Sequence, residues 1–215
     1  MSDRYPDYDV LAKRDTPSWN DQTRRVVERR LAIDPDAHAF FDEAQWATLR
    51  AVCESIVPQP KDRARPAPLA AMVDAKLKAN EGDGYRDARL PRQDEAWPLG
   101  LRAIEAEAQT RFSAPFHELD GARRDEILRD LHEDRPRSDA WGGMSPKLFF
   151  ETLLLHDIVG AYYAHPHAWN EIGYGGPASP RGYVRLNTDR RDPWEAAEAK
   201  PGRAEEARRE NARVG

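Results

Sequence analysis

One apolar segment constrains the fold of this chain more than any other. Ser145-Pro146 reads as a helix N-cap followed by proline at the first helical position. Pro166 has no N–H and must end the helix. The apolar residues between them cover most of the helix circumference, and they are Leu148, Phe149, Phe150, Leu153, Leu154, Leu155, Ile158, Val159 and Ala161. A helix that is apolar nearly all round belongs in the middle of a core, so we predict that the domain is built around this one.

The segment after Pro166 predicts a functional surface. It reads as a loop rich in glycine and proline, and large aromatic side chains gather in and just before it: Tyr162, Tyr163, Trp169, Tyr174 and Tyr183. Such side chains are enriched at protein interfaces, because one end can be buried while the other forms hydrogen bonds. For any single residue the alternative is packing on the domain's own core. For the loop as a whole we favour an interface, with Trp169 and Tyr174 as its anchors.

The rest of the chain predicts an all-α fold. Helical spacing of apolar residues recurs in several segments, and Asp42 with Gln45 forms a capping-box pattern before one of them. No segment shows the alternation typical of a strand. Residues 81–98 read as a long surface connection. We therefore predict a single irregular domain of about five to six helices over residues 20–185.

The two ends of the chain show little helical periodicity. Residues 1–19 predict a loose N-terminal arm, and residues 186–215 predict a charged, partly disordered tail. Trp194 is the only large apolar anchor of that tail. The first 40 residues hold no apolar run of the kind that follows the charged start of a signal peptide. We therefore expect a protein that is cytoplasmic as synthesised and periplasmic only if a partner carries it.

Composition excludes several classes of function. The net charge of −5 gives no broad electrostatic case for nucleic-acid binding. The apolar helix is too short and interrupted for membrane insertion, which takes about 20 apolar residues. Cys53 is the only cysteine, so no internal disulfide can form.

Candidate catalytic and metal-binding patterns are weak. His165 and His167 are separated by proline, and His156 lies more than two helical turns from His165, so a shared metal ion is not expected. The glycines at 173–176 follow a helix and not a strand, unlike a dinucleotide fingerprint. We predict no catalytic, cofactor-binding or metal-binding residue in this chain. The alternative is a stand-alone metal-dependent enzyme that uses these three histidines.

Two motifs resemble a known family. One is LRAVCESIVPQP (49–60), a helix that ends in an Ile-Val-Pro piece, and the other is GAYYAHPHAWNEIGYGGPASPRGY (160–183). Together they resemble gluconate 2-dehydrogenase subunit 3, over roughly residues 40–185. The resemblance implies a helical subunit without a cofactor. It also implies a partner, a large FAD-dependent oxidoreductase of the glucose–methanol–choline type, often joined by a cytochrome c subunit. The small subunit is implicated in maturation or export of that flavoprotein.

The resemblance and the aromatic pattern together give a set of expected partner-binding residues. The residues that match the family's motif are Trp169, Asn170, Ile172, Gly173 and Tyr174. The predicted aromatic interface adds Tyr162, Tyr163 and Tyr183. We expect these eight residues to lie on the surface that contacts the flavoprotein.

Overall fold

The computed structural model describes residues 4–60, 66–82, 84, 87–182, 192 and 194–213. Every regular element in these ranges is helical, so the prediction of an all-α fold is confirmed, with more helices than the five or six expected. Packing groups the chain into two compact units. We call Asp34–Tyr162 the central unit, and Met1–Ile33 with Tyr163–Gly215 the terminal unit. The ends of the chain are thus grouped together, which local sequence patterns could not indicate.

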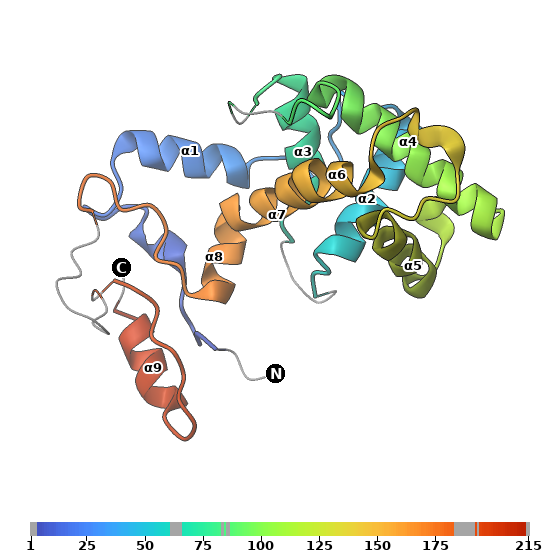
Figure 1. Cartoon of the computed structure of the whole chain (residues 1–215). Helices are drawn as coiled ribbons and strands as arrows, with labels where there is room; N and C mark the ends of the chain where they lie inside the picture. The colour runs from blue at the N-terminus through green and yellow to red at the C-terminus, as the bar shows by residue number, and fades with distance from the viewer. Residues whose placement is uncertain are drawn as a thin grey trace. The chain divides into compact units, whose positions relative to one another are not determined.

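Figure 1 shows the helices, labelled in chain order. The α-helices are α1 (Asp21–Leu31), α2 (Glu43–Ile56), α3 (Leu69–Lys78), α4 (Gln93–Phe112), α5 (Gly121–His132), α6 (Pro146–Phe149), α7 (Leu155–Ala164), α8 (Pro166–Ile172) and α9 (Ala204–Asn211). Short 3₁₀ turns are η1 (Val10–Lys13), η2 (Phe116–Glu118) and η3 (Asp139–Trp141), and η4 (Phe150–Leu154) is a π-helical turn.

The core of the central unit is formed where α2, α4 and α6 meet. Trp97 of α4 is fully buried, and its ring packs edge-on against Phe149 of α6 at 5.6 Å between ring centres. Gly100 permits this approach, because a β-carbon there would lie 2.2 Å from Phe149 Cζ. The helix α4 begins at Gln93 and contains Pro98, although the sequence predicted a surface connection up to that proline. Burial of Trp97, just before Pro98, explains why packing overrides the local cost of the proline.

The predicted central helix begins where expected, with the Ser145 side chain accepting a hydrogen bond from the Leu148 N–H. It is not a single α-helix, because the π turn η4 separates α6 from α7. Phe149, Leu154 and Ile158 are fully buried, whereas other apolar residues, including Leu153, are only half-buried. The expectation that this helix lies in the middle of a core is therefore wrong in part, since it buries one face.

The terminal unit has a core of its own. Its buried residues come from both ends of the chain, and they are Tyr8, Val10, Trp19, Val27, Trp169 and Ala196. Residues 4–19, expected as a loose arm, are packed here around the turn η1. Part of the expected tail is also ordered, because Asn211 of α9 is buried and its side-chain amide donates to the carbonyl of Pro6 at 2.8 Å. Periodicity analysis misses part of this core, because Tyr8 and Trp19 lie in irregular segments and Val10 lies in the short turn η1.

Candidate docking surface

Exposed apolar side chains gather in the segment that the sequence singled out. The large hydrophobic residues exposed in the described part of the chain are Tyr163 (51%), Ile172 (43%) and Tyr174 (42%). All three belong to the terminal unit and to the predicted partner-binding set. We call them the docking residues. A contiguous exposed apolar patch is typical of surfaces that bind another protein, and these three side chains are the candidates for such a patch.

One of the docking residues, Ile172, lies in a short helix, α8, where the sequence predicted a loop, while Tyr174 follows that helix and Tyr163 lies in α7. Pro166 ends the preceding helix but also begins α8, since proline suits the first helical position. The His165 side chain caps α8 by accepting from the His167 N–H. Gly173 ends it with a φ of +67°, the left-handed conformation that favours glycine. Ile172 and Tyr174 flank this glycine, so α8 fixes where both side chains emerge.

Three other expected partner-binding residues are occupied by contacts within the chain. Trp169 is only 2% exposed, and its indole N–H donates to the Tyr163 carbonyl at 2.7 Å. The Asn170 side-chain oxygen accepts from the Val10 N–H at 2.8 Å. A β-carbon at Gly173 would lie 2.5 Å from the Tyr5 ring. These residues therefore hold α8 against the N-terminal segment, which was the alternative left open by the sequence.

The remaining two residues of the expected set lie elsewhere. Tyr162 is half-buried and belongs to the central unit. Tyr183 lies outside the residues that the structure describes. The structure thus brings Tyr163, Ile172 and Tyr174 into one unit as exposed groups, and it assigns Trp169 to the core of that unit.

Sequence reasoning missed a buried lysine beside this surface. Lys13 has no exposed area, and its ammonium donates to the Gly175 carbonyl at 2.7 Å and to the Tyr8 hydroxyl at 3.2 Å. Burial lowers the pKa of Lys13 to about 8, helped by the nearby charge of Arg181 and opposed by Glu195. Lys13 is followed by the charged residues Arg14 and Asp15, so only the apolar residues before it, Val10 to Ala12, could have hinted at its burial.

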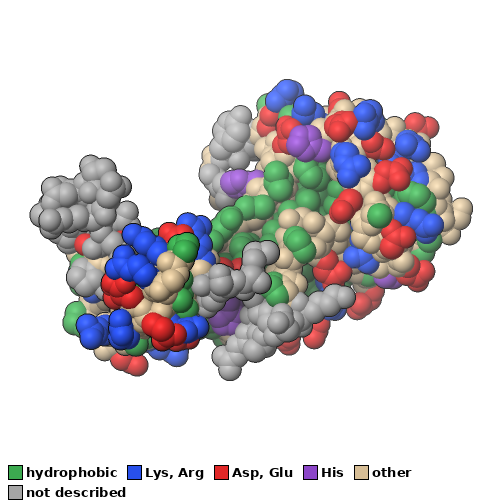
Figure 2. All heavy atoms as spheres, turned by 90° about the horizontal axis from the view of Figure 1, so that it is seen from below, with side chains coloured by type: hydrophobic (Ala, Val, Ile, Leu, Met, Phe, Trp, Pro, Cys, Tyr) green, Lys and Arg blue, Asp and Glu red, His purple; other side chains and the backbone are tan. Residues whose placement is uncertain are grey.

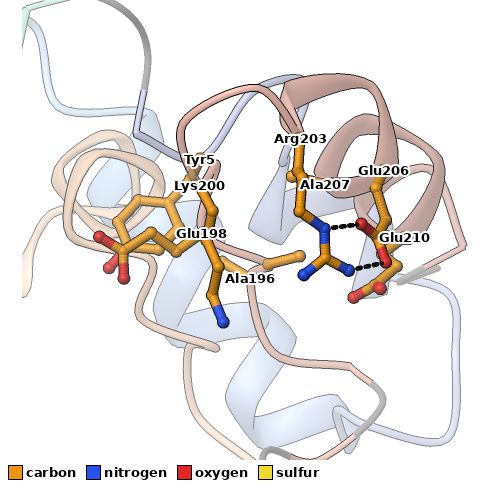
Figure 3. A pocket seen from close by; sticks show the side chains of 9 residues that line it. Tyr5, Ala196, Glu198, Lys200, Arg203, Glu206, Ala207 and Glu210 are labelled. Carbon is orange, nitrogen blue, oxygen red and sulfur yellow. Dashed lines mark hydrogen bonds and ion pairs between the residues drawn. The ribbon is translucent and has the colours of Figure 1, made fainter.

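Tyr5 also lines a cavity of about 430 Å³ (Figure 3). It is formed within the terminal unit by Tyr5, the tail and α9. Arg203 donates to both carboxylate oxygens of Glu206 at 2.5 and 2.6 Å, and Arg4 pairs with Glu198 at 2.7 Å. Positive and negative side chains thus neutralise one another around the cavity, which gives it no strong preference for a charged ligand.

The histidine pattern does not form a metal centre in the structure. His165 is buried at the start of α8, and its ring meets that of His167 edge-on at 4.8 Å, while His156 belongs to the central unit. Among the described residues, no group of three or more potential ligands could hold a metal ion. Burial also raises the pKa of the Cys53 thiol far above its usual range, which disfavours the reactive thiolate.

The glycine-rich stretch serves packing. A β-carbon at Gly176 would lie 2.8 Å from Val10 and 3.3 Å from Trp19, so this glycine lets the loop lie directly on two core side chains. Close approach to apolar groups is the opposite of what a phosphate cradle needs, where backbone N–H groups face an anion. The stretch therefore packs on the core of the terminal unit.

Charged residues of both signs are mixed on the surface. Figure 2 shows lysine and arginine interspersed with aspartate and glutamate on the face it presents. Within the ranges that the structure describes, none of the helices combines the length and apolar character needed to cross a membrane.

Comparison with known proteins adds an independent observation. The family model described as gluconate 2-dehydrogenase subunit 3 matches residues 43–176, which is more than half of the chain. No curated protein and no solved structure matches it. The matched range runs from α2 through α8 to Gly176 and includes all three docking residues, but not residues 4–19 or the tail. The chain therefore belongs to the gluconate 2-dehydrogenase subunit 3 family.

Proposed function

We propose that this chain is a non-catalytic accessory subunit that binds and helps mature or stabilise an FAD-dependent alcohol or sugar dehydrogenase. The partner is a flavoprotein of the glucose–methanol–choline type, which holds FAD and carries out catalysis, with a cytochrome c subunit as a further member of the complex. The proposal rests on membership of a family named as one subunit of a dehydrogenase. Exposure of the docking residues within the family-matched range supports it.

The docking residues suit this role for a physical reason. Few residues supply most of the binding energy of an interface, and tyrosine is enriched among them. Tyr163 and Tyr174 each offer an apolar ring and a hydroxyl, while Ile172 adds aliphatic area. Because Ile172 and Tyr174 flank a glycine that ends α8, binding orders little backbone that is not already fixed.

Co-expression with the flavoprotein tests the proposal directly. We expect a tagged chain to retain a yellow protein with the absorbance of bound flavin. The chain purified alone should be colourless and should not pass electrons from an alcohol or sugar to an artificial acceptor. Stoichiometric flavin in the isolated chain, or turnover by it, would overturn the proposal in favour of an enzyme. Stoichiometric zinc or iron lost on replacing His165 and His167 would do the same.

Truncation of the docking residues gives a quantitative prediction. We expect Ile172→Ala or Tyr174→Ala to weaken flavoprotein binding by about thirtyfold, since a hot-spot residue contributes roughly 2 kcal/mol and about 1.4 kcal/mol is tenfold. Thermal stability should barely change, because both side chains are about two-fifths exposed (43% and 42%). Titration by calorimetry measures the affinity. The exposed Gln109 of α4, changed to alanine, serves as a control. Equal affinities for all three variants would remove the docking residues from the interface.

A further inference from the structure

The docking residues lie in the family-matched range, yet several side chains that pack against the loop after α8 lie outside it. The matched range begins at residue 43. Tyr5 fills the space beside Gly173, and Val10 with Trp19 fills the space beside Gly176. The Asn170 side chain also bonds the Val10 N–H at 2.8 Å and Asp9 at 3.2 Å, across about 160 residues of chain. Thus the loop after α8 lies on a surface made by the N-terminal segment.

The tail in turn holds the N-terminal segment. The Ala199 N–H donates to the Arg4 carbonyl at 2.9 Å. Asn211 of α9 donates to the Pro6 carbonyl at 2.8 Å and to the Ala197 carbonyl at 3.1 Å, so one buried amide joins both ends of the chain. Figure 3 shows Tyr5 beside this part of the tail, with Ala196 and Glu198.

Lys13 is the polar centre of this arrangement. Its buried ammonium reaches the carbonyl of Gly175, the residue next to Tyr174, at 2.7 Å. Gly175 is itself buried, so its carbonyl depends on a donor from the protein. Because Lys13 has no exposed area, it cannot touch a partner and can act only through the loop.

We propose that residues 4–19 and 194–211 form a terminal scaffold that fixes the loop 173–176, and that Lys13 is a positioning residue for partner binding. The inference rests on the proposed function for the identity of the partner, a flavoprotein that offers an apolar surface to Ile172 and Tyr174. A loop held in one shape before binding loses less conformational freedom on association. Recognition in this chain therefore depends on segments that the family's shared region does not include.

The burial of Lys13 gives the scaffold a specific dependence on pH. Among the described residues, the titratable groups that act on Lys13 are Tyr8 in the N-terminal segment, Arg181 after α8 and Glu195 in the tail. The pKa is about 8 when the loop is closed, and opening returns the ammonium to water, where its ordinary pKa is 10.5. The open state therefore binds more protons between these values. Raising the pH from 8 towards 10.5 favours the closed loop.

Hydrogen exchange on the full chain tests the scaffold without a partner. We expect Lys13→Met and Asn170→Ala each to speed exchange of the amides at 173–176 by at least tenfold, with no change in α4. Lys78→Met, which changes an exposed lysine, should match the wild type. Protection of these amides, corrected for intrinsic rates, should rise from pH 7 to pH 9.5 in the wild type and in Asn170→Ala, but not in Lys13→Met.

Affinity for the co-expressed flavoprotein completes the test. We expect Lys13→Met to bind about tenfold more weakly than Lys78→Met. Unchanged exchange, or altered exchange with unchanged affinity, would overturn the positioning role of Lys13. If Lys13→Met does not fold, hydrogen exchange and flavoprotein affinity are both measured on Asn170→Ala. If the wild type binds no flavoprotein while the exchange results are as expected, the proposed function fails and the terminal scaffold stands.

Discussion

Replacing Trp169 with alanine is expected to lower the free energy of unfolding of the terminal unit by about 3–5 kcal/mol, the usual cost of deleting a buried tryptophan side chain. Trp169 is 2% exposed and packs with Tyr8, Val10 and Trp19 in the core of this unit. The change also removes the indole donor that meets the Tyr163 carbonyl at 2.7 Å. Thermal melting followed by near-ultraviolet circular dichroism measures the loss.

The exposed neighbour of Trp169 supplies the matched control. The Tyr174 ring meets the Trp169 ring edge-on at 5.7 Å between ring centres but is 42% exposed, so Tyr174→Ala should leave the melting temperature nearly unchanged. Trp169→Ala thus tests the contribution to stability, and Tyr174→Ala tests the contribution to partner binding. A Trp169→Ala protein that melts like the wild type, yet no longer binds the flavoprotein, would show that Trp169 is a docking anchor after all.

Helix starts were the most predictable part of this fold, because the signals that set them are local. The Asp42 carboxylate caps α2 by accepting from the Gln45 N–H at 2.8 Å, and the Gln45 side chain returns the bond. Asp120 caps α5 and Ser145 caps α6 in the same way. A cap is decided within about four residues, so sequence alone identifies it. The all-α class follows from the same local periodicity.

Elements fixed by distant contacts were not predictable. The turn η1 carries no helical pattern of apolar residues, and the Val10 N–H in it donates to Asn170, about 160 positions away. The helix α8 is not predictable from local sequence, because Pro166 can either end a helix or begin one. Pro98 likewise suggested a break, yet buried Trp97 holds the helix together around it. Tertiary packing outweighs local propensity in each case.

The candidate site shows the same division. Composition located the segment in which the exposed large hydrophobic side chains of the described residues lie, because tyrosine, tryptophan and isoleucine gather there. It could not separate exposed residues from buried ones, since α8 turns Trp169 inward and leaves Ile172 outward. Aromatic character is shared by both groups. Whether a side chain is buried in the core or exposed depends on its position relative to α8. The sequence did not predict this helix.

A buried carboxylate in α4 joins several segments of the central unit. Glu107 has no exposed area, and one of its oxygens accepts from the Ser138 N–H at 2.9 Å and the Trp141 indole N–H at 3.3 Å. Its other oxygen accepts two bonds from Arg111, at 2.8 and 3.0 Å. The Arg111 side chain is 2% exposed and also pairs with Asp130 at 2.8 Å.

Glu107→Ala is therefore expected to lower the free energy of unfolding of the central unit by about 3–5 kcal/mol, because removing one partner of a buried ion pair leaves the other charge uncompensated. Arg111 keeps only Asp130 of its two carboxylates, and the segment at 138–141 loses the acceptor that orders it. Denaturant unfolding followed by circular dichroism measures the change. Glu107→Gln, which retains an acceptor oxygen but no charge, should lose less. A double-mutant cycle with Arg111→Met isolates the ion pair. If Glu107→Ala costs less than about 1 kcal/mol, the value typical of an exposed pair, the network does not hold this unit together.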